Sequence, residues 1–215
     1  MTPREKSLLV NALTFARVPL IFAWAVLAVL QEFTIRPGGG NFTLAVCACA
    51  AMLFSGLTDL WDGQLARKWS VVSTLGKMAD PLMDKVFYIV AFPTLVWQVM
   101  HQGDNQAHAL VLLLLTIFYM LRDTWVTFMR SIGTMYGADV AAMMLGKVRT
   151  AISFPGAGWV YMYLCFRSFA PASWDRPWLL SCYAVEGLLL VLTLVSLWTY
   201  TAAYMPYLRR ALASR

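Results

Sequence analysis

The sequence predicts an all-α integral membrane protein with six transmembrane helices. Hydrophobic residues make up 60% of the chain and charged residues only 13%, whereas soluble domains carry roughly 25% charge. Apolar runs recur along the whole length, and several are long enough to cross a hydrocarbon core of roughly 30 Å as helices. Because the chain has 215 residues, we expect one membrane domain over residues 1–215 without a separate soluble domain.

The first three helices are predicted from the places where apolar runs begin and end. The basic segment 1–12 precedes the first run, and because a good cleavage site is lacking, we expect a juxtamembrane segment and an uncleaved helix. Glycine and polar residues at 31–41 separate this helix from the second, and a polar link at 101–107 ends the third. The predicted helix cores are 13–30, 42–60 and 76–99.

The last three helices are predicted in the same way. The polar link at 167–177 separates the fifth helix from the sixth, and Trp178 stands at an end of the sixth, as expected at a membrane interface. Pro155 and the glycines after it interrupt the fifth run, which predicts a kink with close helix packing and not a phosphate-binding loop. The predicted helix cores are 108–130, 149–166 and 178–204.

The basic residues predict how the helices are oriented. With an even number of spans both termini lie on one side, and most lysines and arginines fall on that side. Since loops rich in positive charge stay in the cytoplasm, we expect both termini to be cytoplasmic and the protein to lie in a bacterial inner (plasma) membrane. The opposite links hold only Arg36, Arg167 and Arg176. The terminal side holds Arg4, Lys6, Arg67, Lys68, Lys77, Lys85, Arg130, Lys147, Arg149, Arg209, Arg210 and Arg215.

Several isolated polar residues have structural explanations. The four cysteines form no CxxC pair, so we expect inert thiols. His101 and His108 both fall in a polar link and lack the further ligands of a zinc site. Arg17 lies about one turn from the cytoplasmic end of the first helix, where its side chain is expected to reach the surface. For Glu186, a hydrogen-bonded glutamate between helices and a catalytic residue both remain open.

Four of the 11 acidic residues gather in one stretch, at Asp59, Asp62, Asp80 and Asp84. An ionised carboxylate at membrane depth costs on the order of 3 kcal/mol or more, so the cluster is a candidate functional site. On helices, Asp59 and Asp62 share one face, and Gly76, Asp80 and Asp84 form another row. Where two such rows converge, divalent cations are the simplest relief of the repulsion. Hard oxygen ligands at this density predict Mg²⁺ or Mn²⁺ and not zinc.

Small residues and one arginine accompany the aspartates. Gly63, Ala66 and Gly76 leave space for a bulky group to approach the backbone, although such residues also simply pack helices closely. Arg67 lies near them and can bind phosphate oxygens through two parallel hydrogen bonds. The combination predicts a metal-held diphosphate substrate at the membrane surface. A cation pathway or a set of structural ion pairs is the alternative.

The stretch from Asp59 to Asp84 reads D-x2-D-G-x2-A-R-x8-G-x3-D-x3-D, which resembles the signature of the CDP-alcohol phosphatidyltransferase family without a departure. The family has six spans, and the resemblance implies a homodimer with a cytoplasm-facing active site. It also implies that Asp59, Asp62 and Asp80 hold two metal ions and the CDP diphosphate. Asp84 would bind metal and act as the base that deprotonates the acceptor hydroxyl. The nucleotide would also be lined by Gly63, Ala66, Arg67 and Gly76.

Further stretches resemble the branch of the family that uses glycerol phosphate. They are Asp80-Pro81-Leu-Met-Asp84-Lys85, Asn11-Ala-Leu-Thr14-Phe-Ala-Arg17, Arg122-Asp123, Arg130 and Gly146-Lys147-Val-Arg149-Thr150. Asp123 and Arg149 replace the glutamate and the lysine of that branch, and both changes are conservative. Supporting roles in the site are therefore expected of Asn11, Thr14, Arg17, Lys85 and Asp123.

Basic residues near the aspartates predict the chemistry of the acceptor. Arg122 and Arg130 are eight positions apart on the fourth helix and so lie near one face, while Lys147 and Arg149 open the fifth. A pocket of these four residues suits an acceptor that carries its own phosphate, such as glycerol 3-phosphate. Contacts with anionic lipid headgroups, or a role in topology alone, are the alternatives.

We therefore predict an enzyme that transfers a phosphatidyl group from CDP-diacylglycerol to glycerol 3-phosphate, giving phosphatidylglycerophosphate and CMP. A hydroxyl attacks the phosphorus that carries diacylglycerol, and CMP leaves. Cardiolipin synthase and inositol-phosphate transferase are alternatives within the family, and a divalent-cation transporter is the alternative from another class. The expected partners are CDP-diacylglycerol, glycerol 3-phosphate and membrane lipids, and no nucleic acid.

Overall fold

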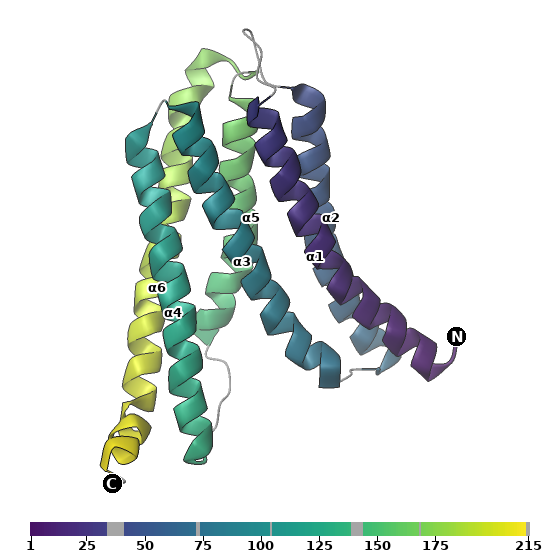
Figure 1. Cartoon of the computed structure of the whole chain (residues 1–215), viewed down its shortest axis with the longest axis vertical. Coiled ribbons are helices and arrows are strands. Elements are labelled where there is room, and N and C mark those ends of the chain that lie inside the picture. Colours follow the sequence, from purple (N-terminus) through teal and green to yellow (C-terminus); the bar gives the residue numbers. More distant parts are fainter. Residues whose placement is uncertain (34–40, 72–73, 104, 139–143, 168, 214–215) are drawn as a thin grey trace.

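The computed structural model describes residues 1–33, 41–71, 74–103, 105–138, 144–167 and 169–213, without the side chains of residues 74, 75, 77, 78, 80, 81, 144, 145 and 147. Every regular element in these ranges is an α-helix, and the helices form one bundle (Figure 1). The prediction of an all-helical fold is confirmed, and the described ranges contain six helices. The helices are α1 (Pro3–Phe33), α2 (Phe42–Trp69), α3 (Thr74–Gln102), α4 (Gln106–Met135), α5 (Met144–Phe166) and α6 (Ala172–Ala213).

The helices extend beyond the predicted apolar cores because polar residues cap or continue them. The side chain of Asn41 accepts a hydrogen bond from the backbone of Leu44 at the start of α2. At the other end, Ser70 adopts a left-handed conformation with φ 53° and closes α2. Asn105 likewise caps α4 by accepting from the backbone of His108. The predicted core 108–130 is thus confirmed as helical from His108 on, and the assignment of His101 and His108 to a polar link was wrong, because α3 continues to Gln102 and α4 begins at Gln106.

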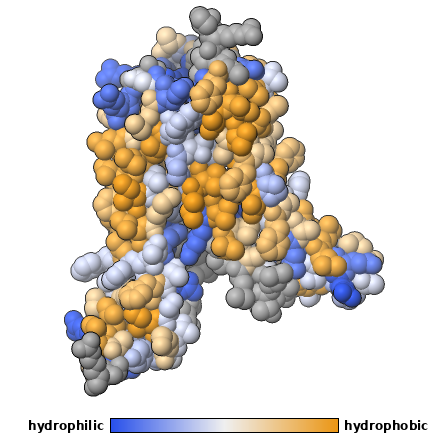
Figure 2. All heavy atoms as spheres, in the orientation of Figure 1, coloured by the Kyte–Doolittle hydropathy of each residue, from blue (hydrophilic) through white to orange (hydrophobic). Residues whose placement is uncertain are grey.

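Five helical segments are long and apolar enough to cross a membrane. Among the described residues these are α1, α2, the Leu82–Gln102 part of α3, α4 and α6. Figure 2 shows hydrophobic residues over the body of the bundle, with hydrophilic residues at its ends and in the hollow between its two lower arms. These are the features of an integral membrane protein.

Both chain termini lie at the same end of the bundle, which we call the terminal end; the opposite end is the far end (Figure 1). α1 packs against α2 and α3, and α4 packs against α3 and α6. Towards the terminal end, α1 and α2 diverge from α4 and α6, and α3 and α5 lie between the two arms.

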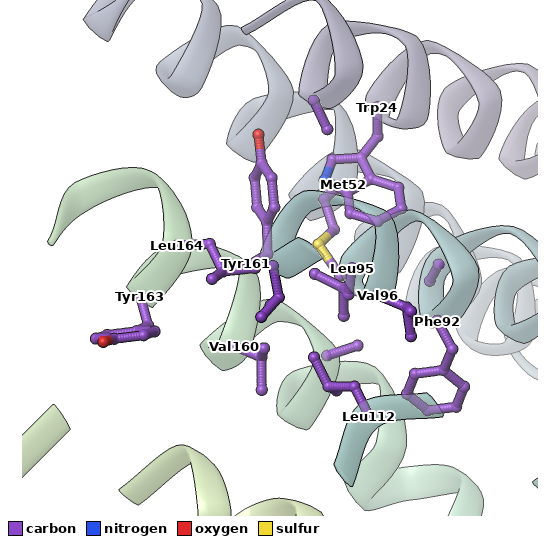
Figure 3. Close-up of a cluster of buried hydrophobic side chains, with 14 of the residues drawn as sticks. Trp24, Met52, Phe92, Leu95, Val96, Leu112, Val160, Tyr161, Tyr163 and Leu164 are labelled. Carbon is purple, nitrogen blue, oxygen red and sulfur yellow. The ribbon is translucent and has the colours of Figure 1, made fainter. Parts of the chain in front are cut away.

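The core fills the part of the bundle where all six helices are close together. Trp24 of α1 meets Tyr161 of α5 edge to face, with ring centroids 5.3 Å apart. Phe92, Leu95 and Leu112 pack in the same buried cluster (Figure 3). Because this core ties the helices together away from the diverging arms, polar residues nearer the terminal end are free to line cavities.

Glycines allow two close helix contacts around α5. A Cβ atom on Gly56 would lie 2.6 Å from the Phe154 ring, and one on Gly156 would lie 2.9 Å from a methyl group of Val185. The close packing predicted next to Pro155 is therefore confirmed, and α5 continues as a helix through this proline. These contacts hold α5 against α2 and α6, and so fix one wall of each cavity described below.

Candidate active site

The structure brings three of the predicted aspartates together around one arginine of α1. Asp59 and Asp62 come from neighbouring turns of α2, and Asp84 comes from α3. The guanidinium of Arg17 forms ion pairs with all three: Nη2 with Asp59, Nη2 with Asp62 at 3.4 Å, and Nη1 with Asp84 at 3.4 Å. The aspartate rows of the two helices thus meet, with a cation of the protein itself between them.

The prediction that the Arg17 side chain reaches the surface was wrong. It is only 4% exposed, because α1 already begins at Pro3 and the carboxylates of α2 and α3 pair with the guanidinium. Thr14, one turn earlier, donates a hydrogen bond of 2.7 Å to Asp62. Asn11 lies a further turn back and is partly buried. α1 therefore contributes a polar face to the site, as the predicted support residues suggested.

A first cavity, which we call the donor cavity, opens beside the aspartates and has a volume of about 640 Å³. Arg17, Asp59, Asp62, Gly63, Arg67 and Asp84 line its polar side, and Leu53, Leu57, Leu60, Phe87 and Phe154 line its apolar side. Beside Gly63 the nearest atoms are those of the Arg67 guanidinium, 3.8 Å from where a Cβ would be. Among the described side chains, Ala66 and Gly76 are not part of this lining.

A second cavity, which we call the basic cavity, has a volume of about 610 Å³ and lies between α3, α4, α5 and α6. Three of the four residues predicted to bind the acceptor phosphate line this cavity: Arg122, Arg130 and Arg149. The two cavities share four lining residues, which are Asp84, Tyr88, Thr150 and Ala151. Asp84 therefore lies where a group bound in one cavity would meet a group bound in the other.

A hydrogen-bonded network organises the arginines of the basic cavity. Asp123 Oδ1 accepts from Arg122 Nη1 at 2.9 Å and from Arg149 Nη2 at 2.5 Å. Arg122 also donates to Ser196 of α6, and the Arg149 guanidinium lies 3.8 Å above the ring of Tyr119. Asp123 thus holds two guanidinium groups side by side, which is a stronger role than the support predicted for it.

The network leaves donors of Arg149 without partners. The Nε and Nη1 atoms of this buried side chain have no hydrogen-bond acceptor in the described part of the structure. Buried guanidinium donors that lack acceptors cost free energy, and an anion in the cavity would satisfy them. The arrangement therefore favours binding of a phosphate or carboxylate group.

Several residues at the basic cavity were missed by sequence reasoning. Tyr88 and Tyr200 line it, and Ser196 accepts hydrogen bonds from Arg122, yet none of the three belongs to a motif. Ser196 and Tyr200 come from α6, which lies outside the stretches that carry the resemblance. Gly146 was quoted only as part of a pattern, yet a Cβ there would lie 3.2 Å from the Tyr200 hydroxyl and 3.3 Å from Arg122. Lys85 donates to Thr127 of α4 at 3.0 Å and borders the basic cavity. The predicted side chains of Asp80 and Lys147 lie outside the described residues.

The chemistry of the acidic residues fits a hard divalent cation. Carboxylate oxygens are the ligands that Mg²⁺ and Mn²⁺ prefer, and those of Asp59, Asp62 and Asp84 already surround a positive group. As they stand, no three acidic, histidine or cysteine side chains in the described ranges are arranged to hold an ion. The guanidinium of Arg17 lies among these carboxylates and pairs with each of them.

Comparison with known proteins decides the family. The sequence signature of the CDP-alcohol phosphatidyltransferase family matches residues 7–199. The chain belongs to this family. It is therefore an enzyme, a phosphatidyltransferase of phospholipid biosynthesis, and the predicted resemblance is confirmed.

Relatives of this phosphatidyltransferase carry two kinds of name. The chain is 33% identical over 143 residues to the CDP-diacylglycerol–glycerol-3-phosphate 3-phosphatidyltransferase of Bacillus subtilis. The aligned region covers 65% of this chain and 69% of the relative. It is 31% identical over 172 residues to the protein of the same name from Treponema pallidum, with 78% and 74% covered. It is also 28% identical over 177 residues to the cardiolipin synthase (CMP-forming) of Streptomyces coelicolor, with 76% and 74% covered.

Proposed function

We propose that this phosphatidyltransferase transfers the phosphatidyl group of CDP-diacylglycerol to glycerol 3-phosphate, with Mg²⁺ or Mn²⁺ as cofactor, and releases phosphatidylglycerophosphate and CMP. The observation that carries the proposal is the position of Asp84. It lines both the donor cavity and the basic cavity. This position suits a base that acts between a diphosphate donor and a phosphorylated acceptor.

The donor cavity suits a lipid-linked diphosphate. Asp59 and Asp62, together with Asp80 and Asp84, would hold two divalent cations, and Arg67 lies on the same wall to bind phosphate oxygens. The bound cations would neutralise the diphosphate and stabilise charge on the attacking and leaving oxygens. The leucines of α2 and the rings of Phe87 and Phe154 offer an apolar surface to the diacylglycerol part.

The basic cavity supports an acceptor with its own phosphate. Arg149 has two donors without partners, and Arg122 and Arg130 border the same space. Two guanidinium groups match the double charge of a phosphate monoester better than the single charge of a phosphodiester. This favours glycerol 3-phosphate over phosphatidylglycerol, the acceptor of a cardiolipin synthase.

The residues of the chain then divide the work of the reaction. The arginines of the basic cavity hold the acceptor phosphate, so that its hydroxyl points to the shared wall. Asp84 is 40% exposed and takes the proton of that hydroxyl as the oxygen attacks the phosphorus that carries diacylglycerol; the bond to CMP breaks. A carboxylate is a weak base, so the positioning of the acceptor hydroxyl next to Asp84 and the reacting phosphorus must supply much of the acceleration.

We further propose that the site faces the cytoplasm of a bacterial cell and that the protein is a homodimer. The excess of lysine and arginine on the terminal side supports the orientation, and both cavities lie towards that end of the bundle. The homodimer is proposed from family resemblance.

An acceptor panel tests the proposal. Purified protein is incubated with CDP-diacylglycerol, Mg²⁺ and one acceptor, and CMP release is measured. We expect release with glycerol 3-phosphate and little with phosphatidylglycerol or inositol phosphate. Release with phosphatidylglycerol alone would make the protein a cardiolipin synthase. Cation uptake into protein-containing liposomes that CDP-diacylglycerol does not affect, without CMP release, would favour the transporter.

A further inference from the structure

Arg17 occupies an unusual position for a charged residue of a membrane helix. It lies in the apolar α1, is buried, and forms ion pairs with Asp59, Asp62 and Asp84 from two other helices. Thr14, on the same face of α1, adds a neutral hydrogen bond to Asp62. α1 thus reaches into the acidic cluster with one charged and one uncharged side chain, and these two contacts can be tested separately.

One guanidinium cannot neutralise this cluster. Three carboxylates pair with the single positive charge of Arg17, beside a cavity of about 640 Å³ that Arg67 also lines. Like charges in a site of low dielectric repel one another strongly. Among these four groups the carboxylates outnumber the guanidinium, which favours binding of further cations, yet oxygens that such cations would use are already engaged by Arg17.

We propose that Arg17 is a positioning residue that stands in for the divalent cations. It holds Asp59, Asp62 and Asp84 together while the site is metal-free, and it competes with the metal for their oxygens. The inference rests on the proposed metal-dependent function. Two cations compete for one set of anionic ligands, so binding of the metal and the contacts of Arg17 are negatively coupled.

The competition predicts opposite effects on stability and on metal affinity. Without Arg17, the metal-free carboxylates lose the guanidinium that pairs with all three of them, and the metal-free protein becomes less stable. The metal then binds carboxylates that no longer pair with a guanidinium. Because this competing interaction is gone, the affinity for the metal rises. An ordinary structural ion pair, or an arginine that only binds substrate phosphate, would not raise the affinity for metal.

The test measures Mn²⁺ binding to the full chain in detergent by electron paramagnetic resonance, without CDP-lipid and again with CMP. We expect Arg17→Gln to bind Mn²⁺ more tightly than the unmodified protein, within the range of about 5- to 150-fold that is usual for coupled ligands. Its melting temperature should be lower without metal, and the increase on adding Mn²⁺ should be larger. Arg17→Lys keeps the positive charge but cannot contact several carboxylates with a planar guanidinium. Its Mn²⁺ affinity and melting temperature should lie between those of Arg17→Gln and the unmodified protein.

Two variants serve as matched controls. Thr14→Val removes a hydrogen bond to Asp62 but no charge, so it should not tighten Mn²⁺ binding. Arg149→Gln removes an equally buried arginine that pairs with Asp123 in the basic cavity, so it should leave the affinity for Mn²⁺ unchanged. If Arg17→Gln unfolds without metal, its melting temperature is followed against Mn²⁺ concentration, and rescue by Mn²⁺ at lower concentrations than the unmodified protein needs supports the proposal.

Equal or weaker Mn²⁺ binding by Arg17→Gln overturns the inference, and the proposed function stands if the acceptor panel succeeds. If the unmodified protein binds no Mn²⁺ with or without CMP, the inference and the metal dependence of the proposed function both fail. If only the KM for CDP-diacylglycerol rises in Arg17→Gln, the arginine is a substrate ligand and does not compete with the metal.

Discussion

The carboxylates at the two ends of the bundle lie in opposite environments. At the far end, Glu186 of α6 pairs with His108 of α4 at 2.7 Å, and both side chains are 1% exposed. Near the terminal end, Asp59 and Asp84 are 52% and 40% exposed although both pair with Arg17. The first pair is enclosed by packed side chains, and the second group opens onto two cavities.

Glu32 repeats the pattern of the far end. Its Oε1 atom accepts hydrogen bonds from the side-chain amides of Gln98 at 3.2 Å and Gln102 at 2.9 Å. These neutral donors tie α1 to α3, just as the histidine ties α4 to α6. In this chain we therefore expect a carboxylate at membrane depth to mark a functional site only where several gather beside a cavity.

Asp84→Asn should have the largest effect, because it removes a carboxylate from the group that opens onto the two cavities. We expect kcat to fall by about 10³-fold or more, because general bases contribute about 10²- to 10⁴-fold and this residue is also a metal ligand in the proposed function. CMP release measures the effect, and Glu186→Gln, a matched change at the far end, should retain activity. If Asp84→Asn kept a tenth of the activity, Asp84 would not be the base.

His108→Ala should have the largest effect at the far end, and on stability rather than catalysis. The change leaves Glu186 without the partner that its Oε1 atom has at 2.7 Å, which we expect to cost about 2 kcal/mol. Thermal unfolding in detergent measures this loss. The kcat of the folded fraction should stay unchanged, and a lower kcat with unchanged unfolding would contradict a structural role.

Arg149→Gln tests whether the two cavities are separate substrate sites. Loss of one charged contact with a phosphate should raise the KM for glycerol 3-phosphate by about tenfold, which corresponds to about 1.4 kcal/mol. The KM for CDP-diacylglycerol should not change. Arg167→Gln, at a site near Tyr163 towards the far end, is the control and should change neither KM. Equal increases in both KM values would show that the cavities are not separate sites.

Glu32→Gln should have the smallest effect. Buried polar contacts between membrane helices contribute about 0.6 kcal/mol on average, and a glutamine can still accept from at least one neighbouring amide. We expect a change in unfolding free energy below about 1 kcal/mol, with normal kcat and KM. A variant that lost activity would place functional chemistry at the far end as well.

Much of the fold and part of the site were predictable from local pattern. Apolar runs and the links between them predicted the helices, and helical spacing placed Asp59 and Asp62 on one face of α2. The ends of the helices were predicted less well, because caps such as Asn105 and Ser70 act through backbone geometry that a hydrophobic pattern does not contain. For the same reason His101 and His108 were assigned to a polar link, although α3 continues to Gln102 and α4 begins at Gln106.

By itself, the sequence determined that this chain is a helical membrane protein, that it belongs to the CDP-alcohol phosphatidyltransferase family, and that acidic and basic residues cluster on neighbouring helices. Only the tertiary structure decided which of them meet. Arg17 contacts Asp84 across 67 positions of the chain, Arg122 contacts Ser196 across 74, and His108 contacts Glu186 across 78. Periodicity fixes the face of a helix on which a residue lies, but the neighbour that this face meets depends on how all six helices pack.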